Sequence, residues 1–148
     1  NNLIKSKLFN SSIIFISLDN GWINFDNTIF KGDIGDLNLI DGNLENLKDD
    51  LIFNGNFKYN VSSEDQFYRL FQINKKNRKK IDNIYFDIKY NLTKEKFIIK
   101  NLILEPGKIK LEEELIDVLD LSDNPKKINN WIDFKNFVRN IFVNYYEG

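Results

Sequence analysis

The chain has 148 residues, of which 42% are hydrophobic and 29% charged, so it can form one folded domain with a buried core. Its 21 Lys and Arg residues and 22 Asp and Glu residues give a net charge of -1, which argues against a nucleic-acid-binding protein that depends on bulk positive charge. It contains no Cys and no His, which excludes thiol nucleophiles, disulfides, imidazole bases and most zinc, copper or haem sites. We therefore expect a protein that is not an enzyme and that uses no cofactor.

The first third of the chain predicts short strands. Residues 3–9 and 11–18 are rich in β-branched and aromatic side chains, and Asp19-Asn20-Gly21 is typical of a turn. A further strand is expected over residues 22–30. Residues 32–47 predict one or two strands whose register the pattern does not define.

Residues 51–61 show the clearest alternation of apolar and polar side chains, which predicts a strand with one apolar and one wet face. Residues 84–90 repeat the pattern, and residues 97–104 predict a third strand that ends at Pro106-Gly107. The last two strands are expected to form an antiparallel hairpin. The predicted apolar faces consist of Leu51, Phe53, Phe57, Tyr59 and Val61; of Ile84, Phe86, Ile88 and Tyr90; and of Phe97, Ile99 and Ile103, with Ile98, Leu102 and Leu104 on the other side of the third strand.

Two segments have helical rather than strand periodicity. Ser62 with Asp65 resembles a capping box, so a helix is predicted to begin at Ser62 and to end in the basic run 75–80. A second helix is predicted from about Asn130 to Tyr146, with a wide aromatic face. Between them, residues 112–124 fit either a short helix or an extended edge.

The basic run has two interpretations. It can be a solvated helix end whose cations complement the helix dipole, which we favour, or a contact for anionic lipid headgroups. The headgroup hypothesis rests on Lys75, Lys76, Arg78, Lys79 and Lys80.

Several aspartates lie near glycines, which raises the question of calcium. No D-x-[DN]-x-[DN]-G loop is present, and Asp beside Gly more often marks a turn, so we predict no metal site. The aspartates concerned are Asp19, Asp26, Asp33, Asp36 and Asp41.

The apolar strand faces also allow two interpretations. They can form a sealed core under the two helices, or part of them can line a trough for acyl chains. A sheet face needs the same apolar side chains to pack against a lipid tail as to pack against a Leu side chain in a core. The alternation therefore does not distinguish these possibilities.

Three motifs occur in a characteristic order: Phe53-Asn54-Gly55-Asn56-Phe57, a Phe67–Gln72 helix with a basic end, and Ile84–Asp87. Together with the closing residues 129–148, they resemble the C-terminal part of the AsmA-like family of Gram-negative envelope proteins. The resemblance covers roughly residues 32–148. It implies a long, twisted antiparallel sheet curved into a groove, anchored to the inner membrane by an upstream helix. It also implies a role in outer-membrane biogenesis and phospholipid transport across the periplasm.

We therefore expect a β-rich α+β fold, with about seven to nine antiparallel strands, one inserted helix and one C-terminal helix. Residues 1–148 are interpreted as one domain and, since the sequence begins without Met, as the C-terminal piece of a longer, membrane-anchored periplasmic protein. No apolar run is long enough to span a bilayer. The expected partners are phospholipid acyl chains and other envelope proteins, with no nucleic acid. The alternative is a structural or protein-interaction domain with a sealed core.

Overall fold

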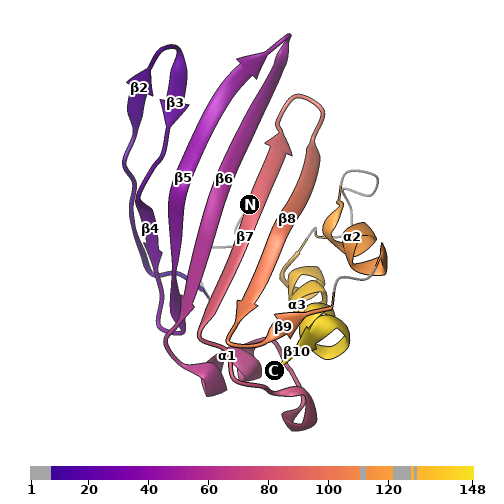
Figure 1. The fold of residues 1–148 in the computed structure, drawn as a ribbon. Helices are drawn as coiled ribbons and strands as arrows, with labels where there is room; N and C mark the ends of the chain where they lie inside the picture. The colour runs from indigo at the N-terminus through magenta and orange to yellow at the C-terminus, as the bar shows by residue number, and fades with distance from the viewer. Residues whose placement is uncertain (1–7, 111–112, 122–127, 129) are drawn as a thin grey trace.

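The computed structural model describes residues 8–110, 113–121, 128 and 130–148. They form a β-rich α+β fold with a large antiparallel sheet and a C-terminal helix, which confirms the predicted fold class (Figure 1). The strand expected over residues 3–9 lies mostly outside the described residues. The strands are β1 (Ser11–Ile13), β2 (Ser17–Asp19), β3 (Trp22–Asn24), β4 (Thr28–Lys31), β5 (Gly35–Leu47), β6 (Asp50–Val61), β7 (Asn83–Asn91), β8 (Lys96–Glu105), β9 (Lys108–Ile109) and β10 (Tyr146–Glu147). The helices are α1 (Glu64–Leu70), η1 (Lys75–Asn77), α2 (Glu113–Leu119), α3 (Trp131–Asn140) and the π-helical η3 (Ile141–Tyr145).

Eight strands form one open sheet in the order β1-β4-β5-β6-β7-β8, with the β2–β3 hairpin joined to β5 through β3. The small strands β9 and β10 pair separately. The two longest strands, β5 and β6, are connected by Lys48-Asp49, whose φ angles are both positive (48° and 75°). Positive φ at both central residues is the requirement of the tight turn that matches strand twist, although these are not the residues usually found there.

The register of β5–β8 separates the large sheet into two faces. Leu39, Phe57 and Phe86 are opposite one another on β5, β6 and β7, and lie on what we call the apolar face. The other side, the polar face, is held by side-chain hydrogen bonds. Asn56 Nδ2 donates to Asp87 Oδ1 (2.7 Å), and Asn101 Nδ2 donates to Asp87 Oδ2 (2.6 Å). The alternation predicted for residues 51–61 and 84–90 is therefore present.

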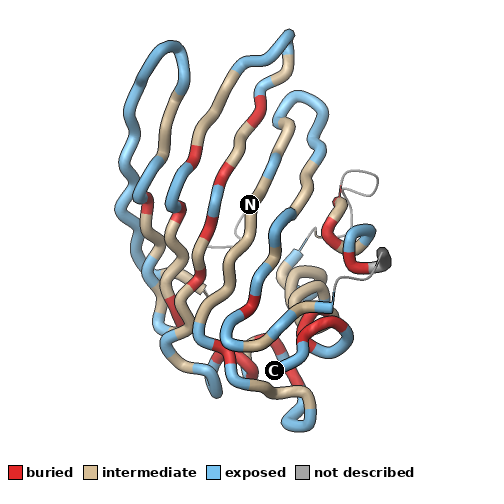
Figure 2. Tube along the Cα trace, viewed as in Figure 1, coloured by how far each residue is buried: buried red, intermediate tan, exposed pale blue. Residues whose placement is uncertain are grey.

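The helices cover one end of the apolar face. Phe67, Tyr68 and Phe71 from α1 and the segment after it pack with Phe142 of η3 and with Tyr59 of β6 in one hydrophobic cluster. Figure 2 shows buried residues in helical segments at this end and also at intervals along β5 and β6. The cluster also contains Ile73, Ile81, Leu104, Leu115, Leu119, Ile141, Tyr145 and Tyr146.

The first predicted helix is shorter than expected. It begins at Glu64, and its N-cap is Ser63, whose side chain makes no capping hydrogen bond, so the prediction of a cap at Ser62 is wrong. It ends near Phe71 because Gln72 has a φ of 55°, which no α-helix accommodates. The basic run is consequently not the end of this helix: it begins with the separate 3₁₀ turn η1.

The C-terminal helix is confirmed. Asn130 is its N-cap, and its Oδ1 accepts hydrogen bonds from the backbone N–H groups of Ile132 (2.9 Å) and Asp133 (3.0 Å). The undecided segment 112–124 contains the helix α2 and then a single bridge between Asp120 and Ile98 of β8, so it combines both interpretations. No helix in the described part of the chain is long and apolar enough to cross a membrane.

Candidate functional site

Beyond the helices, the apolar face continues as a surface rich in aromatic residues. We call this part the distal patch; it is formed by Phe53, Phe57, Phe86, Ile88, Tyr90 and Phe97 on β6, β7 and β8. The rings of Phe57 and Phe86 stack with centroids 5.2 Å apart, and Phe53 meets Phe57 at 6.4 Å. Tyr90 and Phe97 form an edge-to-face pair at 5.9 Å. None of these six residues belongs to the helix-covered cluster.

Two glycines let these side chains lie flat on the sheet. Gly42 and Gly55 are directly opposite each other on β5 and β6. A Cβ added to Gly55 would lie 2.8 Å from Phe57 Cε2 and 2.9 Å from Phe53 Cε1, and one added to Gly42 would lie 2.7 Å from Leu39 Cδ2. Such covering of a strand glycine by a neighbouring ring is a known device in sheets.

This arrangement explains an unusual pattern of exposure. Phe57 and Leu39 are only 9% and 4% exposed although they lie outside the helix-covered cluster. Phe53, Phe86, Ile88, Tyr90 and Phe97 are half-buried. The apolar face is thus sealed where the helices cover it and becomes partly accessible toward the distal patch.

The predicted lipid-facing residues separate into these two zones. Tyr59, Ile84 and Ile99 pack in or against the helix-covered cluster, whereas the six residues of the distal patch lie beyond it. Leu51 lies at the start of β6, opposite Asn46, and is 37% exposed.

The prediction for Ile103 is wrong. A bulge between the register pairs Tyr85/Ile103 and Asp87/Lys100 shifts the β8 register by one residue, and Asn101 within it has a φ of 51°. Ile103 therefore lies opposite Tyr85 on the polar face, and it is 53% exposed. The same shift moves Leu102 and Leu104 to the apolar face, where both contact the helix-covered cluster. A shift of one residue moves every following side chain of the strand to the opposite face of the sheet.

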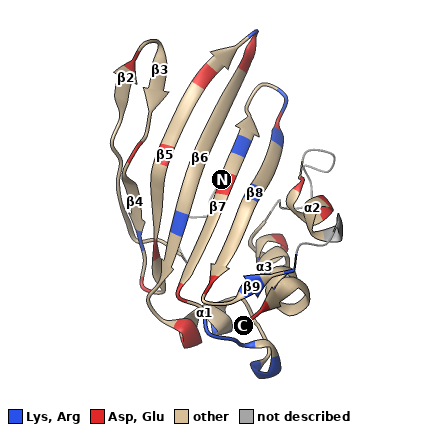
Figure 3. Ribbon diagram, in the orientation of Figure 1, with Lys and Arg blue, Asp and Glu red and all other residues tan. Residues whose placement is uncertain are grey.

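The residues of the basic run 75–80 have different surroundings in the fold (Figure 3). Arg78 forms a salt bridge with Asp65 (3.1 Å) and donates from Nε to the carbonyl of Ile73 (2.9 Å). Lys80 pairs with Asp82 at 3.3 Å. Both side chains therefore have partners within the molecule. The helix end that the favoured interpretation expected here is absent, because α1 ends before the run, and headgroup binding stays a prediction.

Lys79 has an internal role as well. Its Nζ donates to the carbonyl of Tyr146 (2.7 Å) and lies 5.8 Å from the centre of the Tyr146 ring. It therefore attaches the C-terminal strand β10 to the segment that leads into β7.

Lys75 and Lys76 are exposed, and neither forms an ion pair with another described residue. Lys76 borders a shallow hollow of about 500 Å³ together with Arg139 of α3. Arg139 is 63 positions away in the sequence, so spacing gave no signal for this meeting. The remaining lining residues are Gln72, Asn74, Asn77, Asn136, Asn140, Val143 and Asn144.

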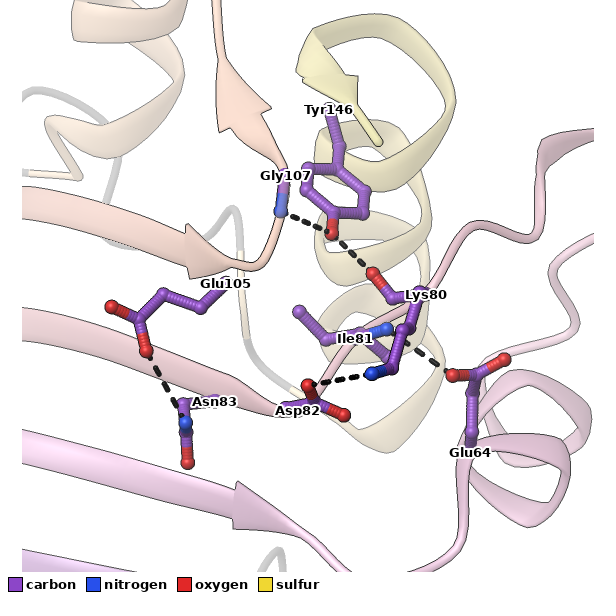
Figure 4. Close-up of polar contacts among 8 residues, drawn as sticks. All are labelled: Glu64, Lys80, Ile81, Asp82, Asn83, Glu105, Gly107 and Tyr146. Atoms are coloured by element: carbon purple, nitrogen blue, oxygen red, sulfur yellow. Dashed lines mark hydrogen bonds and ion pairs between the residues drawn. The ribbon is translucent and has the colours of Figure 1, made fainter.

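Figure 4 shows how the chain end is fixed to the sheet. The Tyr146 hydroxyl donates to the carbonyl of Lys80 and accepts a hydrogen bond from the backbone N–H of Gly107 (3.2 Å). Glu64 Oε2 accepts from the N–H of Ile81 (3.2 Å), which links α1 to the same segment. Burial raises the pKa of the Tyr146 hydroxyl above its usual value, and the hydrogen bond from Gly107 opposes that shift.

Tyr59 contains an unusual polar group at the border between the sealed zone and β5. Its hydroxyl is buried and has no hydrogen-bond partner among the described residues. Burial, assisted by the nearby charge of Asp36, raises the pKa of Tyr59 to about 12.

Two of the aspartates considered for calcium accept backbone hydrogen bonds within the sheet region. Asp26 Oδ1 accepts from the N–H of Gly42 (3.0 Å), and Asp36 Oδ1 accepts from the N–H of Gly32 (3.2 Å). Within the described part of the chain, no three acidic, His or Cys side chains are grouped as a metal site would require.

Comparison with known proteins finds no matching family model, no matching curated protein and no matching solved structure. The residues and their geometry therefore carry the functional argument.

Proposed function

We propose that the chain is a section of a periplasmic β-groove protein that handles phospholipid acyl chains during outer-membrane biogenesis. The distal patch is the observation that supports this proposal most directly. It is a partly accessible aromatic extension of the apolar face. It continues from the helix-covered cluster but is not itself covered by the helices. In the same proposal the chain has no enzymatic activity, acts with other envelope proteins and is tethered to the inner membrane through an upstream anchor.

The chemistry of the face suits a hydrocarbon ligand. None of the residues that β5–β8 direct toward the apolar face is charged. An acyl chain makes no hydrogen bonds, so its binding depends on apolar area removed from water, worth roughly 25 cal/mol per Å². Half-buried Phe and Ile side chains provide such area without needing a polar partner.

The test is the binding of a short-chain phosphatidylglycerol, added below its micelle concentration and followed by NMR shifts and native mass spectrometry. We expect shifts in the distal patch and a loss of affinity of about tenfold or more, equal to about 1.4 kcal/mol, in Ile88→Glu. Tyr85→Glu is the matched control, since it lies on the same strand but on the polar face. Absence of binding by the wild-type chain, or equal loss in both variants, contradicts the proposal.

A second candidate, a structural domain with a sealed core, is favoured by a specific observation. Phe57 and Leu39 are almost fully buried by their own neighbours. If the distal patch closes on itself in this way, the sheet needs no ligand. Unchanged distal-patch signals throughout the lipid titration would support this candidate.

A further inference from the structure

The outer strand on the β2 side of the sheet differs from every other strand in its exposure. Residues 11–19 run along this edge as β1, an irregular step at Ile14–Ile16, and β2 (Figure 1, indigo). On its inner side the edge pairs with β4 and β3. On its outer side the edge pairs with no other described strand.

This edge exposes large apolar side chains to solvent. Its five large apolar residues are each 49% to 78% exposed, and they are Ile13, Ile14, Phe15, Ile16 and Leu18. Residues 11–18 contain no charge and no proline. Natural sheets usually protect an edge with charges, proline or bulges, because unpaired backbone groups recruit further strands.

The opposite edge of the sheet has this protection. Strand β8 carries Lys96, Lys100 and Glu105 and is interrupted by the bulge at Asn101. Part of its backbone is also occupied, since the N–H of Leu121 donates to the carbonyl of Phe97 (3.0 Å) and Asp120 bridges Ile98. The β8 edge is therefore blocked by charges, a bulge and a bound segment, whereas residues 11–18 have only the irregular step at Ile14–Ile16 and no charge or proline.

We propose that residues 11–18 are an interface at which a second copy of this chain adds its own residues 11–18 antiparallel, continuing the sheet across a two-fold axis. Two identical strands suit each other here because neither has a charge to repel its partner. An antiparallel register centred on Ile14 sets Ile13 against Phe15, and one centred on Phe15 sets Ile14 against Ile16, so the central cross-strand pairs are apolar.

The assembly closes at two copies. A two-fold interface uses the same surface on both partners, so the open edge of each copy is consumed. The blocked β8 edge prevents further growth. This proposal is independent of the acyl-chain function, because the interface lies on β1 and β2 and the distal patch on β6–β8.

The test measures molar mass by sedimentation equilibrium over a range of protein concentrations. We expect the wild-type mass to rise to that of two copies, and Ile14→Lys and Ile16→Lys to weaken dimerisation at least about tenfold, equal to about 1.4 kcal/mol. Ile116→Lys on α2 is the matched control, because Ile116 is 65% exposed, as is Ile16, but lies away from the edge. Amide exchange in residues 11–18 should slow as the dimer forms.

Three outcomes overturn the proposal. They are a wild-type chain that stays monomeric at its highest soluble concentration, a mass that grows beyond two copies, and a dimer weakened equally by Ile116→Lys. Circular dichroism of each variant checks that the chain is still folded, so that loss of the dimer is not caused by unfolding.

Discussion

Phe57 and Phe86 stack across the β6–β7 pairing, with ring centroids 5.2 Å apart and planes inclined by only 9°. They are direct register partners, so the stack is a cross-strand pair of the type that stabilises antiparallel sheets. Phe57 is buried, whereas Phe86 is half-buried. Within the distal patch, the stack thus joins a ring covered by its neighbours to one that is partly accessible.

The energetic role of Phe86 can be measured against a fully covered ring. Phe67 is 2% exposed within the helix-covered cluster, so Phe67→Ala should destabilise the fold by about 3–5 kcal/mol. Phe86→Ala should cost less, about 1–3 kcal/mol, because part of its area already faces water. Equilibrium denaturant unfolding gives both values. Equal losses in the two variants would mean that the distal patch is as sealed as the core.

The two helix starts provide a second comparison. Asn130 accepts two backbone hydrogen bonds at the start of α3, so Asn130→Ala should lose about 0.5–2 kcal/mol. Ser63, the N-cap of α1, makes no side-chain capping bond, so Ser63→Ala should change stability by less than about 0.5 kcal/mol. Amide exchange of Ile132 and Asp133 should accelerate only in the Asn130 variant. A larger loss from Ser63→Ala would mean that its hydroxyl caps α1 in solution.

The sequence predicts those features that depend on local periodicity. Phe53, Phe57 and Phe86 share a face because strand alternation has a period of two and is uninterrupted through β6 and β7. The prediction fails for Ile103 because the bulge at Asn101 is a backbone event, and asparagine, which tolerates positive φ, is too common in this chain to mark one position as a bulge.

The same limit applies to the helix and the basic run. Gln72 ends α1 with a positive φ although glutamine favours helices, so tertiary packing of Phe71 and Ile73 overrides local propensity. That Lys76 and Arg139 line the same hollow depends on how α3 docks, which short-range sequence patterns do not predict.

Two tyrosines with opposite hydrogen-bonding states give a third prediction. Tyr68 has its hydroxyl bonded to the backbone of Lys79 on both sides, as donor to the carbonyl and as acceptor from the N–H (3.1 Å). Tyr68→Phe leaves both backbone groups without that partner and should cost about 1–3 kcal/mol. Tyr59→Phe removes a buried hydroxyl that has no partner among the described residues, so stability should be unchanged or should rise by up to about 1 kcal/mol. Thermal unfolding of the two variants compares them directly, and a clear loss in Tyr59→Phe would reveal a partner for its hydroxyl.

The same two hydroxyls should make the fold sensitive to alkali. Burial raises the pKa of both Tyr59 and Tyr68 from 10.0 to about 12. Each group therefore binds its proton more tightly in the folded than in the unfolded chain. The stability that comes from this difference in proton binding is fully present below pH 10. It is lost as the pH rises through 12, where the hydroxyl ionises in the folded chain.

Lysines lose their charge in the same range, so the wild-type slope alone is not diagnostic. The free energy of unfolding should be measured between pH 9 and 12 for the wild type, Tyr59→Phe and Tyr68→Phe, a range set by the raised pKa values and the ordinary value of 10.0. Each variant lacks one titrating group and should lose stability less steeply above pH 10, while the lysine contribution is shared by all three proteins. Parallel curves for the wild type and both variants would show that these hydroxyls ionise at the same pH in the folded and unfolded chain.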